Sequence, residues 1–237
     1  MGYGNEHAEL YDIVFLSRGK SWEKEAELLG QMIKSRNPAA ASLLDVACGT
    51  GAHLEYFVKT FAHVEGVEPA EAMREEAEAR LSGPSVHAGD MRTFDLGRTF
   101  DAVTCLGFAV GYMTSQDELD TAISRMAAHL SRDGVLIVEP WWSPERFIEG
   151  YVGGHMVHEP NRVISRITHS TRQGNATRMT IHFVVAQASG IREFHEVEVV
   201  TLFTDEEYTT AFERAGLNVE RLPGPADHPG YLVGRRR

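Results

Sequence analysis

The stretch SLLDVACGTGAHLEYF, Ser42 to Phe57, decides the fold. It opens with an apolar run that carries Asp45, continues into a loop with Gly49 and Gly51, and ends in a segment typical of a helix. Glycines at a strand-to-helix turn permit tight turning and let backbone approach a ligand closely. Because ordinary turns can contain the same two glycines, the loop needs support from the rest of the chain.

Short apolar runs alternate with helix-period segments on both sides of this loop. Pro69 opens a helical segment with an apolar side, and Ser115 begins a capping-box pattern followed by an apolar stripe. The buried strands expected from the pattern are Ser42–Ala47, Val64–Glu68, Ser85–Asp90, Ala102–Leu106 and Gly134–Glu139. This alternation predicts an α/β fold with a doubly wound, mostly parallel sheet.

The pattern changes after Glu139. Three β-branched, partly alternating runs follow, separated by glycine-containing turns, and they predict an antiparallel β-meander: Arg162–Thr171, Thr177–Gln187 and Ile191–Phe203. Thr204 then caps a last helix that stops at Gly216, and Ser21 starts a helix near the N-terminus. We therefore expect a core of residues 1–140 and 204–237, with residues 141–203 as an insert for substrate binding or dimerisation.

Composition excludes several partners. The 237 residues contain 23 Lys and Arg against 34 Asp and Glu, a net charge of −11 that repels nucleic acids and anionic membranes. Cys48 and Cys105 lie in apolar runs without metal or redox spacing, which predicts buried thiols. No leader or membrane-spanning run is visible in the sequence, so we expect a cytoplasmic location.

Acidic residues at the ends of the predicted strands sharpen the interpretation of the loop. Glu68 ends the second strand and is placed to accept both hydroxyls of a ribose, while Asp90 and Met91 end the third and can receive an adenine. Dinucleotide enzymes share the ribose acid, but their third loop glycine is here Leu54. The set favours the S-adenosylmethionine loop of class I methyltransferases, with a seven-stranded sheet, over a Rossmann oxidoreductase or a non-catalytic binder.

Other patterns bear on the methyl acceptor. The segment after the fourth strand lacks the (Asp/Asn)-Pro-Pro-aromatic motif of nucleic-acid amine methyltransferases. Residues 160 to 192 contain no Asp or Glu but five arginines, which predict an anion site or a solvated surface: Arg162, Arg166, Arg172, Arg178 and Arg192. The histidines of this region have no metal-binding spacing, so no metal is expected.

Several motifs together resemble one known family. They are Tyr11-Asp12, Arg18-Gly19-Lys20, LLDVACGTG, HAGDM, EPWWSPERF, HSTRQGNATR and TLFT, in order along nearly the whole chain. They resemble the nucleotide-sugar N-methyltransferases that dimethylate amino sugars such as desosamine and mycaminose for antibiotic biosynthesis. The resemblance implies a dTDP-linked 6-deoxy amino sugar as substrate, S-adenosylmethionine as cofactor with S-adenosylhomocysteine as product, and a homodimer.

The resemblance also implies roles for individual residues. Tyr3 and Tyr112 would lie beside the sugar amine and orient it. Cofactor binding would involve Tyr11, Trp22, Asp45, Ala47, Gly49, Gly51, Glu68, Asp90, Met91 and Leu106, and substrate binding would involve Trp142, Arg166, Ser170 and Arg178. The family's Gly-Arg-Gly near the C-terminus, a diphosphate contact, is here His228-Pro229-Gly230. The position of the amine, the number of methyl groups and a rival O- or C-methylation stay open at this point.

Overall fold

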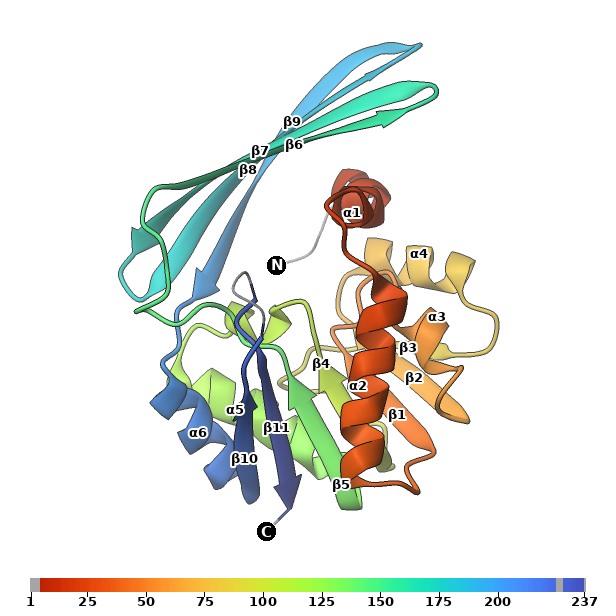
Figure 1. Cartoon of the computed structure of the whole chain (residues 1–237), viewed down its shortest axis with the longest axis vertical. Helices are drawn as coiled ribbons and strands as arrows, with labels where there is room; N and C mark the ends of the chain where they lie inside the picture. Colours follow the sequence, from red (N-terminus) through yellow and green to blue (C-terminus); the bar gives the residue numbers. More distant parts are fainter. Residues whose placement is uncertain (1–4, 225–227, 237) are drawn as a thin grey trace.

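The computed structural model describes residues 5–224 and 228–236 as two sheets with helices (Figure 1). The helices are α1 (Asn5–Ser17), α2 (Trp22–Arg36), α3 (Leu54–Phe57), α4 (Glu71–Arg80), η1 (Ala109–Tyr112, a 3₁₀ turn), α5 (Gln116–Ala128) and α6 (Asp205–Arg214). The strands are β1 (Ser42–Val46), β2 (His63–Glu68), β3 (Ser85–Ala88), β4 (Phe100–Cys105), β5 (Leu130–Val138), β6 (Tyr151–Glu159), β7 (Arg162–Gln173), β8 (Ala176–Gln187), β9 (Gly190–Thr201), β10 (Leu217–Leu222) and β11 (Tyr231–Arg236).

The larger sheet has seven strands in the order β10-β11-β5-β4-β1-β2-β3. All neighbouring pairs from β3 to β5 are parallel, and β11 runs antiparallel to both β5 and β10. This confirms the predicted mostly parallel sheet. Because its parallel strands point the same way, their carboxyl ends lie together at one edge, where a ligand crevice is expected.

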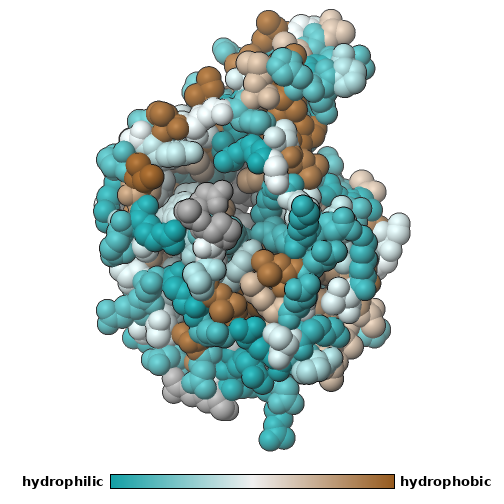
Figure 2. All heavy atoms as spheres, viewed as in Figure 1, coloured by the Kyte–Doolittle hydropathy of each residue, from teal (hydrophilic) through white to brown (hydrophobic). Residues whose placement is uncertain are grey.

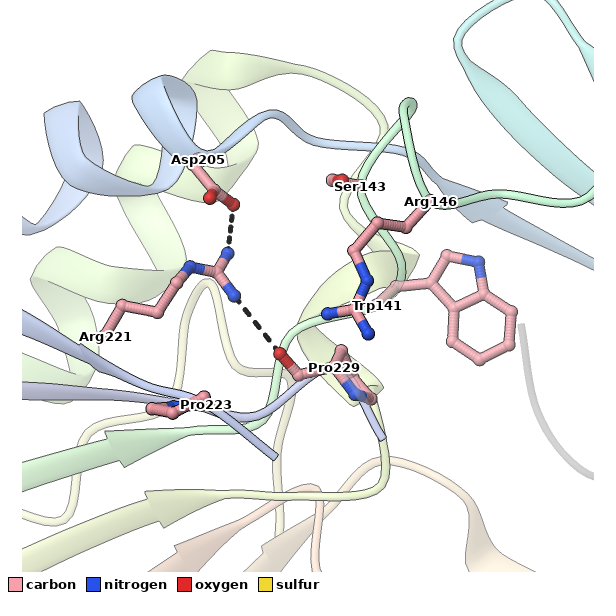
Figure 3. Close-up of a pocket in the computed structure, with 7 residues that line it drawn as sticks. All are labelled: Trp141, Ser143, Arg146, Asp205, Arg221, Pro223 and Pro229. Carbon is pink, nitrogen blue, oxygen red and sulfur yellow. Dashed lines mark hydrogen bonds and ion pairs between the residues drawn. The ribbon is translucent and has the colours of Figure 1, made fainter. Parts of the chain in front are cut away.

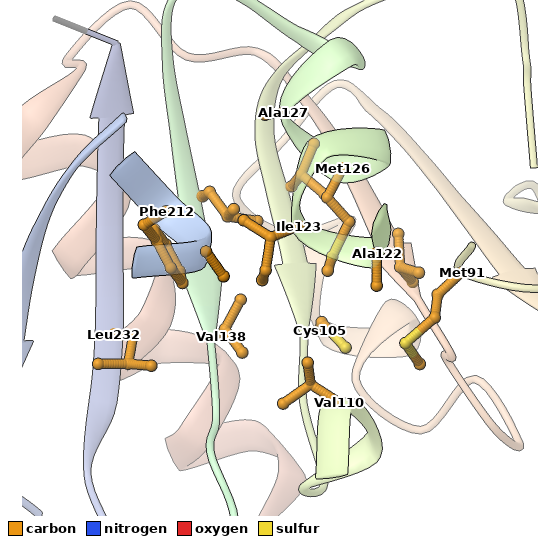
Figure 4. Packing of buried hydrophobic residues seen from close by; sticks show 14 of the residues in the cluster. Met91, Cys105, Val110, Ala122, Ile123, Met126, Ala127, Val138, Phe212 and Leu232 are labelled. Atoms are coloured by element: carbon orange, nitrogen blue, oxygen red, sulfur yellow. The ribbon is translucent and has the colours of Figure 1, made fainter. Parts of the chain in front are cut away.

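Helices cover both faces of this sheet because alternate strand residues point to opposite sides. Leu43 and Ile137 pack with α2 on one face, whereas Leu44 and Val138 pack with α5 and α6 on the other. Figure 4 shows this second layer, with Ile123 and Met126 of α5 over the strands. Each such side chain contributes about 1.5–3 kcal/mol when fully buried, so the two layers fix the frame of the crevice.

The smaller sheet is an antiparallel meander in the order β6-β7-β8-β9. Figure 1 shows it beyond the carboxyl ends of the larger sheet, with α1 between the two. Leu10 and Val14 of α1 pack against Ile164, Ile181 and Phe183 on the inner face of the meander. None of the described helices is long and apolar enough to cross a membrane.

Candidate active site

The loop after β1 makes the tight turns that its glycines predict. Ala47, Gly49 and Gly51 all have positive φ, at 58°, 57° and 71°. A Cβ built on Gly51 would lie 3.0 Å from Leu81 Cδ1 and 3.1 Å from Ala77 Cβ, whereas a Cβ on Gly49 would meet nothing within 4 Å. Gly51 therefore allows the segment around α4 to pack closely, and Gly49 leaves open space beside the backbone.

Glu68 at the end of β2 supports this loop. One carboxylate oxygen accepts from Gly49 N at 3.0 Å and the other from Ala70 N at 2.8 Å. Burial raises the pKa of Glu68, although these two N–H groups lower it. A carboxylate has about four acceptor sites, so Glu68 keeps capacity for two ribose hydroxyls.

Asp45 lies beneath the loop, where only 1% of the residue is exposed. Its Oδ1 accepts from Thr104 Oγ1 at 2.7 Å, and burial raises its pKa to about 6 against the effects of His53 and Thr104. The structure thus places Asp45 between β1 and β4 as a support for the loop.

The adenine-side residues follow β3 and β4. Asp90 forms an ion pair with Arg92 at 2.6 Å, and hydrogen bonds from Arg92 lower the pKa of Asp90. Met91 and Leu106 are buried at 8% and 4% exposure, so each presents little of its side chain. Asp90 and Met91 follow β3, which pairs with the end of β2 at Glu68, whereas Leu106 follows β4, on the other side of β1.

Aromatic rings of α1 and α2 gather over the loop. The ring of Tyr11 lies 4.7 Å from Phe15 and 6.4 Å from Trp22, centroid to centroid. A Cβ built on Gly107, directly after Leu106, would lie 3.7 Å from the Tyr11 hydroxyl. Trp22 Nε1 is buried with no hydrogen-bond partner in the described part of the chain, so a donor is available to a ligand.

The surroundings of Tyr11 are negatively charged. Burial raises the pKa of Tyr11, and so do four nearby carboxylates, those of Glu198, Asp12, Glu139 and Glu68. These carboxylates come from the meander, α1 and the ends of β5 and β2. The arrangement favours a cation beside Tyr11, as a sulfonium or an ammonium group would be.

Helix α1 is tied to both sheets. Asp12 accepts from Thr50 Oγ1 at 2.9 Å and forms an ion pair with Arg80, which connects α1 to the loop and α4. Glu9 pairs with Arg162 and Arg192 of the meander, each at 2.7 Å. The helix therefore covers the crevice from above and links its two walls.

Glu139 is a buried acid that the sequence reasoning missed. It directly follows β5, accepts from Gly107 N at 2.7 Å and lies 2.7 Å from His228 Nε2. Since Gly230 N donates to His228 Nδ1 at 2.9 Å, the imidazole proton resides on Nε2. The rule that identified Glu68, an acid at the carboxyl end of a parallel strand, would also have identified Glu139.

Glu25, Glu139 and His228 bring three ligand atoms within 4.8 Å of one another, within the described ranges. Two nitrogen atoms already contact the first of these acids: Lys20 Nζ lies 3.0 Å and His53 Nε2 2.8 Å from Glu25 Oε2. Although burial alone would raise the pKa of Glu25, His53 and Lys20 lower it to about 2. We therefore assign this cluster to the support of the crevice wall rather than to a metal ion.

Tyr112 ends η1 and is partly buried against the core. Trp141 packs against the same turn: a Cβ on Gly111 would lie 3.2 Å from Trp141 Cβ, and the Phe108 ring lies 5.0 Å away. Tyr3, the other predicted orienting residue, lies outside the described residues. Of the two predicted orienting residues, only Tyr112 can therefore be placed.

The predicted substrate arginines do not share a site within one chain. Arg166 lies on the inner face of the meander, opposite Phe183, together with Ser170. Arg178 is exposed on the outer face, where it donates to Thr180 Oγ1 at 2.9 Å. Because strand residues alternate between faces, the expected grouping of Arg166 with Arg178 is not formed. Burial, and secondarily Arg18, lower the pKa of Arg166.

A cavity of about 250 Å³ opens beside Trp141, where the segment after β5 meets the β10–β11 connection (Figure 3). Its walls include Arg146, Asp205, Arg221 and Pro229. Arg221 is held by an ion pair with Asp205 and a 3.3 Å bond to Pro229 O. The predicted substrate residue Trp142 lies beside this cavity, with the Arg146 guanidinium 4.8 Å from the centre of its ring.

Comparison with known proteins places this site in a family. A family model described as a methyltransferase domain matches residues 43–134. The chain is 47% identical to the dTDP-4-amino-2,3,4,6-tetradeoxy-D-glucose N,N-dimethyltransferase of Saccharopolyspora spinosa, over 99% of this chain and 94% of that protein. It is 46% identical to the dTDP-3-amino-3,4,6-trideoxy-alpha-D-glucopyranose N,N-dimethyltransferase of Streptomyces venezuelae, over 98% of both chains.

A solved structure agrees. An amino pentose methyltransferase from Micromonospora echinaspora, involved in calicheamicin biosynthesis and determined with S-adenosylmethionine bound, superimposes with a TM-score of 0.90. It shares 51% identity, over 96% of this chain and 97% of that one. The class I fold and the cofactor expected from the loop are therefore confirmed. The chain belongs to the family of S-adenosylmethionine-dependent N-methyltransferases that act on nucleotide-linked amino sugars.

Proposed function

We propose that this protein methylates, in two rounds, the amino group of a dTDP-linked 6-deoxy amino sugar in an antibiotic pathway. The observation that carries the proposal is identity of 46–47% over the full chain to two dTDP-amino-sugar N,N-dimethyltransferases. One of these acts on a 4-amino sugar and the other on a 3-amino sugar. Either position of the amine is thus compatible with the fold.

The described residues fit the cofactor. Open space at Gly49, spare acceptor sites on Glu68 and Trp22 Nε1, which has no hydrogen-bond partner among the described residues, would surround the cofactor. Asp45 and Ala47 would hold the loop in shape, while Asp90, Met91 and Leu106 would enclose the adenine. When bound, S-adenosylmethionine supplies an electrophilic methyl group on a sulfonium.

The chain's own contribution to the reaction is orientation and charge. The amine needs a free lone pair, and its attack creates no oxyanion. An amine N–H that donates to the hydroxyl oxygen of Tyr112, with Tyr3, would leave the lone pair free and would suffice to fix the line of attack. The carboxylates that raise the pKa of Tyr11 would favour a positive charge beside this ring, such as that of a sulfonium or an ammonium group.

The inner face of the meander supplies a second wall for the substrate. We assign Arg166, which has no ion pair with the described residues, and Ser170 to the nucleotide, and Trp142 to the sugar side. This division keeps residues 1–140 and 204–237 as the methyl-transfer core and 141–203 as the substrate insert. Arg178, on the outer face of the meander, would not belong to this wall.

We further propose a homodimer in the cytoplasm. Five apolar side chains on the outer face of the meander are 39–77% exposed: Val152, Met156, Ile167, Ile191 and Val197. Figure 2 shows brown atoms along this part of the molecule, while most of the core surface is teal. A second copy would cover this face with the same residues, sheet against sheet.

Mass spectrometry of the product tests the function. The purified protein, S-adenosylmethionine and either dTDP-3-amino or dTDP-4-amino 6-deoxy sugars should give products heavier by one and then two methyl groups. A dTDP-6-deoxy sugar with a hydroxyl in place of the amine is the matched control and should stay unmodified. Methylation of that control would favour the O-methyltransferase alternative.

A further inference from the structure

One arginine of the cavity beside Trp141 has no counterion among the residues that the structure describes. Arg221 is neutralised by Asp205, but Arg146 forms no ion pair with any residue in 5–224 or 228–236. Glu145, its neighbour in sequence, accepts from its own backbone N–H and from Ser143, which lower its pKa, and it does not line the cavity. Among the described residues that line it, the cavity therefore has an excess positive charge, on a chain with a net charge of −11.

Arg146 is also held in place for binding. Its backbone N–H donates to Ser143 O at 3.0 Å, and its guanidinium stacks near the Trp142 ring. In Figure 3 the guanidinium points toward Pro229 at the floor of the cavity. Stacking fixes the plane of a guanidinium while leaving its N–H edge available, which is the geometry that binds phosphate oxygens in pairs.

The size and position of the cavity identify the part of a ligand that it takes. Its volume of about 250 Å³ lies below the range of pockets that hold a whole drug-sized ligand, roughly 300–1,000 Å³. Trp141 lies between the cavity and the turn that ends at Tyr112. A sugar lying along Trp141 would direct its amine toward Tyr112 and its phosphate-bearing carbon toward Arg146.

We propose that Arg146 binds the diphosphate of the nucleotide sugar in this cavity. It would contact the phosphate that is attached to the amino sugar, not the one attached to the deoxyribose. Pro229 forms the floor of the same cavity. The unpaired positive charge of the described lining residues comes from Arg146, in the segment after β5. This inference rests on the proposed function, because it needs a nucleotide-linked substrate.

Calorimetric titration with dTDP and dTMP tests the proposal without turnover. Arg146→Ala should weaken dTDP binding about tenfold or more, as expected for lost charge-assisted hydrogen bonds, and dTMP binding less than threefold. Arg132→Ala, which removes an exposed arginine near the opposite end of β5, should change neither. S-adenosylmethionine affinity should be the same in all three proteins, which shows that they are folded.

The outcomes separate the two proposals. Equal dTDP affinity in the wild-type protein and Arg146→Ala would overturn the assignment of Arg146 and leave the proposed function intact. Equal losses for dTDP and dTMP would overturn the assignment to the sugar-proximal phosphate. No binding of dTDP by the wild-type protein would contradict the nucleotide-sugar substrate itself.

Discussion

Glu68 holds two backbone N–H groups and still has acceptor capacity for a ribose, so its removal affects both the loop and the ligand. Glu68→Ala should weaken cofactor binding by about 2 kcal/mol, the scale of charge-assisted hydrogen bonds. Calorimetric titration with S-adenosylhomocysteine measures this. Glu71→Ala removes an exposed acid three residues away and is the control. An unchanged dissociation constant for Glu68→Ala would remove Glu68 from the site.

Asp45 makes the stability of the protein depend on pH. Its pKa is raised to about 6 in the folded protein, against about 4 in the unfolded chain. Between these values the folded state binds more protons, so the free energy of unfolding falls as the pH rises, by at most about 3 kcal/mol. Asp45→Asn has no such charge and keeps an acceptor for Thr104.

Urea denaturation across this range isolates the effect of Asp45. Asp45→Asn should be more stable than the wild-type protein at pH 7, and the difference should shrink toward zero near pH 4. A difference in unfolding free energy that stays constant with pH would show that Asp45 is not the titrating group.

Tyr112 tests whether the chain supplies orientation or a base. Tyr112→Phe should lower turnover by less than about tenfold, because loss of a general base would cost about 10²–10⁴-fold. The acidic limb of the rate profile should follow the substrate ammonium and keep its midpoint in the variant. Loss of turnover with unchanged substrate binding would instead identify a base.

At the scale of elements, α1 depends on few contacts with the loop. Asp12→Ala removes the bonds to Thr50 and Arg80. We expect faster amide hydrogen exchange in the described turns of α1 and severalfold weaker cofactor binding. Glu55→Ala in α3 is a matched exposed acid that should leave both unchanged. Slow exchange in Asp12→Ala would mean that the meander alone holds α1.

Sequence patterns predicted the five parallel strands of the core, because such strands are largely apolar. The antiparallel strands β10 and β11 were not predicted individually. The start of α2 at Ser21 was also predicted, since its hydroxyl accepts from Lys24 N. β6 was missed because Gly153 and Gly154 weaken its strand signal. α1 was missed because no capping motif marks its start.

The faces of the meander could not be predicted without its register. The hairpin pairs Arg166 with Phe183, an even with an odd position, so Arg166 and Arg178 point to opposite sides. The arginines that were predicted to form one anion site therefore lie on two different faces of the meander. Register depends on the turn between β7 and β8, which the sequence alone left undefined.

At the scale of the whole molecule, the exposed apolar side chains on the outer face of the meander predict that the protein forms a dimer. Sedimentation velocity should give a species of twice the 26.3 kDa chain mass. Ile167→Asp with Val197→Asp should convert it to a monomer, because paired sheets would then bury like charges. Val58→Asp alters an equally exposed apolar residue away from the meander and should remain dimeric. A wild-type monomer at micromolar concentration would contradict the proposal.

Helix α1 contacts both the cofactor loop and the meander, and we expect these contacts to couple release of the cofactor to release of the sugar between two rounds of methylation. The spent cofactor has to leave before a second methyl group is transferred. We expect its exit to require that α1 lifts and that Asp12 releases Thr50 and Arg80. The same helix is bonded through Glu9 to the meander, the wall assigned to the nucleotide. When α1 lifts, its contacts with the meander are also weakened, so the singly methylated sugar nucleotide would be held less tightly at the same time. We therefore expect a distributive enzyme, one that releases the singly methylated sugar and recaptures it for the second round.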